Sequence, residues 1–203
     1  MGESRAKSEE NVYFLERLSK ERRIIQEVLE IGKKYNVTDA LLIPVEEICV
    51  AEWVRLKCKY GCNQYGSSWC CSPETPEPER VRAILKEYSK ALLLCTRSSN
   101  AQFYRDNHKK RRQQVNSWKG TLTLERHLFL SGYYKAFALA AERCALCKEC
   151  AYPEPCRFPT NKRPSVESFS IDVFKTIENA GKKCTVHDDI KSEYSCYSII
   201  LLE

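Results

Sequence analysis

The sequence lacks several features that would place it in a familiar class of protein. No apolar run approaches the roughly 18 residues that a membrane-spanning helix requires. The polar N-terminus, MGESRAKSEE, has no apolar segment of the kind found in a secretory signal peptide. We therefore expect a cytoplasmic protein with no membrane partner, in a compartment where thiols stay reduced.

Signatures of common enzyme chemistry are also missing. The chain has no Gly-rich phosphate loop, no dinucleotide-binding fingerprint and no Ser-His-Asp arrangement. Its only histidines are His108, His127 and His187. We expect His127 to pack within a helix, and nothing near His187 completes a metal site. No site for an organic cofactor is therefore recognisable.

The composition is that of a folded chain. Of the 203 residues, 43% are hydrophobic and 30% are charged, which suits a single domain spanning residues 1–203. The net charge of +6 is concentrated in HKKRR at 108–112. A solvated basic surface is the favoured interpretation of this run, so nucleic acid is not an expected partner.

Apolar periodicity predicts an α/β fold, a small sheet flanked by helices with two irregular Cys-rich loops outside it. Residues 124–143 are expected to form a long apolar helix that leads directly into the second loop. Residues 165–181 are expected to form one amphipathic helix, with Ser165 as its N-cap and Gly181 as its end. The full set of expected elements is helices at 1–35, 78–90, 124–143 and 165–181, strands at 40–50, 91–97 and 194–203, and loops at 58–73 and 144–159.

Cysteine, by contrast, is abundant. The chain has 12 cysteines, eight of which fall in the two loops. Disulfides are the weakest explanation, because the expected compartment is reducing and the vicinal pair Cys70–Cys71 is an awkward partner for cross-links. The four cysteines outside the loops are assigned to packing, namely Cys49, Cys95, Cys184 and Cys196.

The loop at 144–159 has the spacing of an iron–sulfur site. Cys144, Cys147 and Cys150 form a C-x2-C-x2-C run like that of bacterial ferredoxins, whereas structural zinc usually takes two separated Cys-x-x-Cys pairs. Cys156 follows after five residues rather than three, and Arg157 stands where ferredoxins have proline. It is therefore open whether Cys156 joins the same cluster, and zinc remains an alternative.

The loop at 58–73 is a candidate for a second cluster or metal. It contains Cys58, Cys62, Cys70 and Cys71, with glycines that let the backbone wrap closely around an anionic centre. The C-x3-C pair has no third cysteine two residues later, which disfavours a radical-SAM enzyme. Buried free thiols are the alternative for this loop.

Four motifs together resemble a family of predicted metal-binding proteins, domain of unknown function 2284. They are CKYGCNQYGSSWCCSP, ERHLFLSGYYKAFAL, CALCKECAYPEPCRFP and RPSVESFSIDVFKT, in the order of the family. The resemblance maps the family's cysteine onto Cys71 and leaves Cys70 as a local addition. It implies metal binding and gives no reaction.

Three functions follow from these patterns. The first is an iron–sulfur protein with one or two clusters, most simply of the 4Fe-4S type, that exchanges electrons with a partner protein. The second is an enzyme in which Cys58, Cys62 and Cys71 leave one iron open for sulfur-transfer or reductive chemistry on a small molecule. The third is a structural zinc module. The expected metal ligands are Cys144, Cys147, Cys150, Cys156, Cys58, Cys62 and Cys71.

Overall fold

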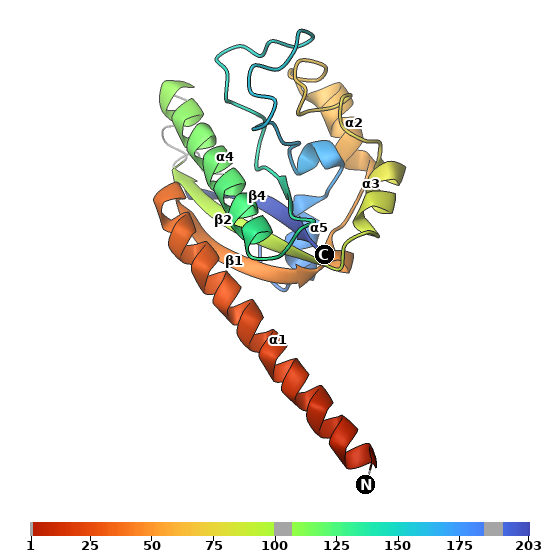
Figure 1. Ribbon diagram of the computed structural model, residues 1–203. Helices are drawn as coiled ribbons and strands as arrows, with labels where there is room; N and C mark the ends of the chain where they lie inside the picture. The colour runs from red at the N-terminus through yellow and green to blue at the C-terminus, as the bar shows by residue number, and fades with distance from the viewer. Residues whose placement is uncertain (1, 100–106, 185–192) are drawn as a thin grey trace.

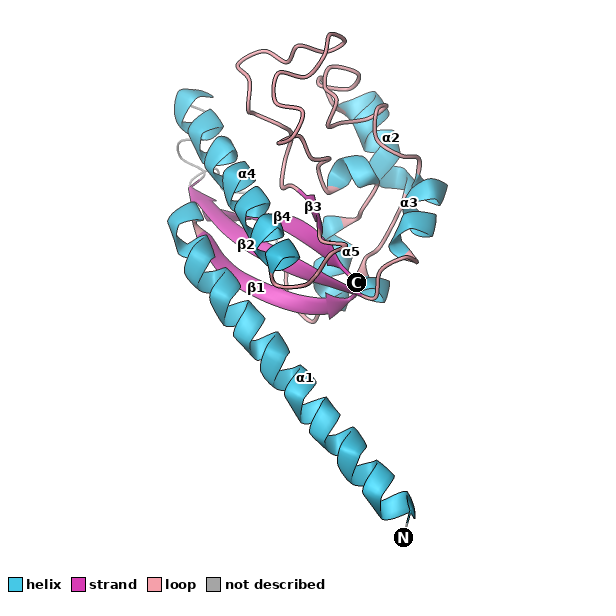
Figure 2. Ribbon diagram, viewed as in Figure 1, coloured by secondary structure: helices cyan, strands magenta, loops and turns pink. Residues whose placement is uncertain are grey.

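The computed structural model describes residues 2–99, 107–184 and 193–203, whose strands form one four-stranded sheet (Figure 2). The strand order is β1-β2-β4-β3, and each neighbouring pair is antiparallel. Helices flank this sheet, so the predicted α/β fold class is confirmed. The strands are β1 (Val37–Pro44), β2 (Lys90–Ser99), β3 (Phe137–Leu139) and β4 (Glu193–Leu202).

Alternating side chains give the sheet a core on each face. In β2, Leu92 and Leu94 belong to one buried cluster, while Leu93 belongs to the other. In β4, Ile200 and Ile199 divide in the same way. Successive side chains of a strand point to opposite faces, so a strand that is apolar throughout is buried on both sides.

Two long helices cover one face of the sheet (Figure 1). They are α1 (Gly2–Gly32), whose N-terminal part extends beyond the sheet, and α4 (Asn107–Leu130). Ile24 and Val28 of α1 lie four residues apart, as do Leu124 and Leu128 of α4, so each pair projects from one side of its helix into the core. No helix among the described residues is long and apolar enough to span a bilayer.

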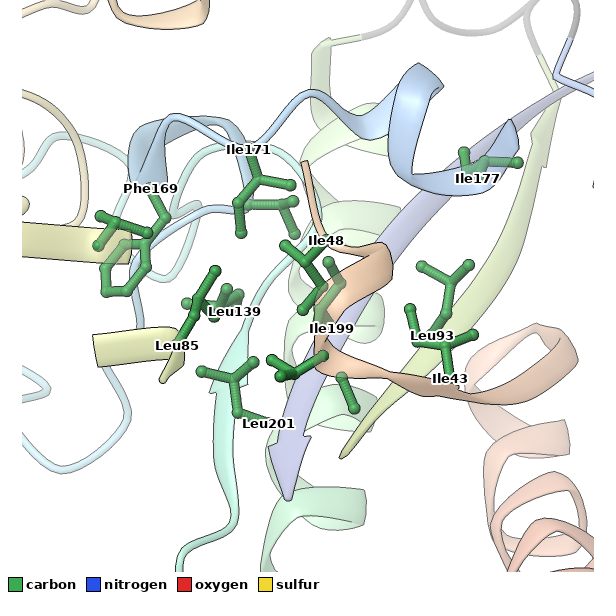
Figure 3. Close-up of a cluster of buried hydrophobic side chains, with 14 residues drawn as sticks. Ile43, Ile48, Leu85, Leu93, Leu139, Phe169, Ile171, Ile177, Ile199 and Leu201 are labelled. Atoms are coloured by element: carbon green, nitrogen blue, oxygen red, sulfur yellow. The ribbon is translucent and has the colours of Figure 1, made fainter. Parts of the chain in front are cut away.

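Shorter elements cover the other face, where Figure 3 shows their apolar side chains meeting those of the strands. Helix α3 begins at Pro78, as predicted. Val54 of α2 is buried, and α2 packs against η4. These elements are α2 (Glu52–Gly61), α3 (Pro78–Leu85), α5 (Val173–Asn179) and the short 3-10 helices η2 (Val45–Glu47) and η4 (Glu167–Phe169), with η1 (Lys33–Tyr35) following α1.

The helix predicted at 124–143 is wrong in its second half, since α4 ends at Leu130. Gly132 has a φ of +99°, and the amide of Tyr133 donates to the carbonyl of Leu128 at 3.1 Å. This is the glycine-terminated helix end in which a buried apolar residue follows the glycine. The chain then pairs with β4 as β3 and enters the cysteine loop from a strand.

The single helix predicted at 165–181 is also wrong, because it is divided into η4 and α5. Ser170 between them has a φ of +57°, and its carbonyl accepts from the amide of Ala51 at 2.8 Å. Asp172, not Ser165, caps α5 by accepting from the amide of Lys175 at 2.9 Å. The predicted end at Gly181 is confirmed by its φ of +74°.

The cysteine segments lie together at one end of the molecule (Figure 1). The first is not wholly irregular as predicted, because Cys58 lies in the last turn of α2. The second runs without regular secondary structure from 144 to 159. The sheet and its helices therefore carry both segments without enclosing them.

Candidate metal centre

The first cysteine group lies where α2 ends. Cys58 is in the last turn of the helix, and Cys62 is the first residue after the helix. Cys71 lies in the turn-rich segment that follows. The spacing of four residues places Cys58 and Cys62 on the same side of a helical turn. All three side chains line a cavity of about 330 Å3, which we call the first cavity. The fold thus brings the three predicted ligands of this loop to one place.

Arg55, one turn before Cys58, fixes this loop. Its guanidinium group donates to Ser72 Oγ at 2.6 Å, to Thr75 Oγ1 at 3.1 Å and to the Thr75 carbonyl at 3.2 Å. Thr75 Oγ1 in turn donates to the carbonyl of Ser168 at 2.7 Å. Ser72 and Thr75 are both buried, where unpaired polar atoms are costly. Arg55 therefore satisfies the polar groups directly behind Cys71.

The second cysteine group surrounds a larger cavity of about 830 Å3, which we call the second cavity. Cys144, Cys147 and Cys150 line it, and Cys71 lies in its wall. Cys156 lines neither cavity, and its sulfur accepts a hydrogen bond from the amide of Phe158 at 3.4 Å. The second cavity thus gathers three of the four cysteines of this loop.

Arg111 of α4 holds the second loop from outside. It donates from Nη2 to the carbonyl of Leu146 at 2.9 Å and from Nε to that of Cys147 at 3.4 Å. Arg111 belongs to the basic run at 108–112 and lines the second cavity. Part of that run therefore serves the cysteine loop itself.

The two loops also contact each other directly. The rings of Trp69 and Tyr152 meet edge to face at 5.0 Å, and Trp69 Nε1 donates to the carbonyl of Glu154 at 2.9 Å. The hydroxyl of Tyr152 donates to Glu74 Oε1 at 3.0 Å. The two cavities share a wall made of Gln64, Cys71, Gln114 and Arg143.

Cys70, which was not among the predicted ligands, lies at the contact between the two loops. It is buried against Trp118 and Ala140, and its thiol is hydrogen-bonded to that of Cys144. This hydrogen bond raises the pKa of Cys70 and lowers the pKa of Cys144. Cys70 and Cys71 lie in consecutive turns, and no sequence signal indicates that these two adjacent residues have different neighbours.

The first cavity concentrates acidic groups. Burial raises the pKa of Cys58, and burial together with the charges of Cys58 and Cys62 raises the pKa of Cys71 to about 12. Burial also raises the pKa of the Glu167 carboxyl, which lines the same cavity. Such crowded groups keep their protons unless a cation replaces them. A metal bound in this cavity would therefore have to displace these protons.

The donor set fits a thiophilic metal. All 12 cysteines are free thiols, and thiolates select zinc, copper(I) and iron–sulfur clusters. Within the described ranges, no three Cys, His, Asp or Glu side chains already stand close enough to hold a single metal ion. Six of the seven predicted ligands thus line two adjoining cavities without closing on one point, and Cys156 lines neither cavity.

The remaining candidates lie elsewhere. Cys184 packs against the core, and with Cys196 it lines a third cavity of about 400 Å3 next to Cys58 and Cys62. His127 Nε2 is 3.0 Å from Glu27 Oε2, between α4 and α1. His187 and the side chain of His108 fall outside the described residues. Arg163, which follows the second loop in the sequence, forms an ion pair with Glu125 at 2.7 Å.

Comparison with known families assigns the chain. A family model described as Predicted metal-binding protein (DUF2284) matches residues 41–202. The chain belongs to this family. The matched range includes every predicted cysteine ligand. No curated protein and no solved structure matches the chain.

Proposed function

We propose that this member of the DUF2284 family binds iron–sulfur clusters at its two cysteine groups and exchanges electrons with a partner protein in the cytoplasm. One observation carries the proposal: cysteines from two distant segments line two cavities that share a wall. Redox centres placed side by side allow an electron to pass within one chain. Two independent structural zinc sites would not need to lie in cavities that share a wall.

In this proposal Cys144, Cys147, Cys150 and Cys156 hold one cluster. Their C-x2-C-x2-C spacing supports a cuboidal cluster, because each thiolate at that period reaches a different iron. The second cluster is held by the first group, Cys58, Cys62 and Cys71. A 4Fe-4S cluster, when bound, supplies one-electron transfer.

The chain's own residues set the conditions for that transfer. Arg111 and Arg143 line the second cavity and place positive charge beside thiolates. Charges and hydrogen bonds around ligating sulfurs are among the factors that tune a cluster's reduction potential. The Cys70 thiol donates a hydrogen bond to Cys144, and so acts on a ligand directly. Replacing either arginine by glutamine is therefore expected to lower the potential.

Anaerobic purification with metal analysis and electron paramagnetic resonance tests the proposal. We expect a brown protein with iron, labile sulfide and the broad visible absorbance of iron–sulfur clusters. Cys147→Ser should remove iron and lower the melting temperature together. Cys49→Ser is the matched control, since Cys49 is half-buried and lines none of the three cavities. A colourless protein with stoichiometric zinc would contradict the proposal.

The third cavity favours one alternative, an enzyme that uses an open iron. This cavity of about 400 Å3 shares Cys58 and Cys62 with the first cavity and is otherwise largely apolar, with Trp53 and Phe174 in its wall. A small molecule there would lie beside the metal of the first group, which has three cysteines rather than four. An exchangeable water or sulfide on one iron would support catalysis, whereas four fixed protein ligands would support electron transfer.

A further inference from the structure

Glu167 is a carboxylate placed among thiols. It lies on η4, which packs against α2, the helix that carries Cys58. Its side chain lines both the first and the third cavity, together with Cys58 and Cys62. Its charge acts on the thiols of Cys58 and Cys71. Glu167 therefore faces the same space as the three cysteines.

No cation among the described residues neutralises this carboxylate. It takes part in none of the ion pairs found there. Arg55 is engaged by Ser72, Thr75 and Glu77, and Arg143 donates to Gln64. Buried charged groups in proteins are either paired or bound to a metal. With no such cation beside it, this carboxyl is either protonated, as its raised pKa favours, or bound to a metal that replaces the proton.

The backbone around Glu167 is held firmly against the cysteine loop. Ser168 is buried, and its hydroxyl donates to the carbonyl of Cys70 at 3.1 Å. Its amide donates to Ser165 Oγ at 3.1 Å. The hydroxyl of Ser165 is hydrogen-bonded in turn to the Glu167 carboxylate. A side chain supported in this way by its neighbours has the preorganisation expected of a metal ligand.

We propose that the Glu167 carboxylate is the fourth protein ligand of the metal site formed by Cys58, Cys62 and Cys71. The proposal rests on the proposed function only in that a metal binds at this site. Carboxylate oxygen is a harder donor than thiolate sulfur and less suited to a thiophilic metal. The carboxylate is therefore the ligand that a small molecule in the third cavity would displace. A metal with four protein ligands in the absence of substrate could in this way still bind a substrate.

Glu167→Gln tests the assignment, because glutamine keeps the shape of the side chain and removes the anionic donor. Glu46→Gln is the matched control, since Glu46 is an exposed glutamate of η2 that lines none of the three cavities. Each variant is purified anaerobically, and iron, zinc and sulfide per chain are measured before and after exposure to a chelator. We expect Glu167→Gln to release the metal that Cys58→Ser releases, with affinity at least about tenfold lower. Glu46→Gln should match the wild type.

Glu167→Cys distinguishes a role of Glu167 as metal ligand from a role as hydrogen-bond partner of Ser165. A thiolate at this position restores a donor but cannot replace the contact with Ser165. Metal retained by Glu167→Cys and lost by Glu167→Gln supports the assignment, with a changed paramagnetic resonance signal as a second readout. Full metal in Glu167→Gln, or loss in both variants, would overturn it. If the wild type carries zinc alone, the electron-transfer proposal fails while the zinc content of these variants still decides the role of Glu167.

Discussion

The sheet and the cysteine loops of this protein are held in place by different interactions. In the sheet, β2 and β4 are buried on both faces, and each face has its own apolar cluster. In the loops, the chain is held largely by polar side chains, such as Arg55 in the first and Arg111 in the second, and by a small apolar cluster around Cys70 and Trp118. Apolar packing thus stabilises the sheet, whereas the loops depend more on hydrogen bonds.

This difference bears on the role of the metal. A loop without regular structure buries little apolar surface, so ordering it costs conformational entropy that packing does not offset. Metal binding adds folding free energy at such a place, because the unfolded chain has no preformed site. We therefore expect metal to stabilise the cysteine end and to matter little for the sheet.

The largest effect is expected in the sheet itself. Ile200 is fully buried in β4, and Ile200→Ala should lower the free energy of unfolding by about 2–5 kcal/mol through lost burial and a cavity. The loss should be the same with and without metal, as measured by denaturant unfolding. Leu15→Ala is the control, since Leu15 is 59% exposed. A loss of unfolding free energy that appears only in the metal-bound protein would show that the stability of the sheet depends on the metal.

Metal removal should act at the other end. Chelation is expected to lower the apparent stability by about 2.7 kcal/mol if the free metal had been near 100 times its Kd. Hydrogen exchange should rise in 62–76 and 144–163 and stay low in β2 and β4. Equal loss of protection in strands and loops would show that the two regions do not unfold separately.

Three of the four strands were predictable, because their signal is local, whereas β3 was expected to be helical. The runs ALLLCTR and YSCYSIILLE each contain at least four consecutive apolar residues, and the strands form where those runs lie. The helix expected at 124–143 failed because apolar periodicity does not distinguish a buried helix from a buried strand. Gly132 was the overlooked signal, since its positive φ ends α4.

The candidate site was predictable only in part. Cysteine spacing identified both loops, but spacing does not reveal that Cys71 borders two cavities or that Cys70 contacts Cys144. Glu167 had no signal at all, because one glutamate in an amphipathic segment is typical of a solvated helix face. Contacts between segments about 100 residues apart come from the fold, which local pattern does not encode.

A smaller effect is expected from Arg55, whose side chain is 11% exposed. Arg55→Ala leaves the buried hydroxyls of Ser72 and Thr75 short of a partner, at a cost of about 1–3 kcal/mol. The loss should appear as faster release of metal to a chelator. Lys59→Ala, an exposed change on the same helix, is the control. Unchanged release in Arg55→Ala would mean that packing, rather than Arg55, orders the first loop.

The last effect, which is small close to pH 9, concerns the pH dependence of the metal-free protein. Burial and neighbouring thiols raise the pKa of Cys71 from 9.0 to about 12. Between these values the unfolded chain has lost the proton that the folded chain keeps, so stability falls as pH rises from about 9 towards 12 and is fully present below that range. The melting temperature of metal-free wild type should therefore drop more steeply above pH 9 than that of Cys71→Ser. If the melting temperatures of the two proteins fall equally with pH, the Cys71 thiol is as solvated in the folded protein as in the unfolded chain. The first loop would then be more open in solution than the structure shows.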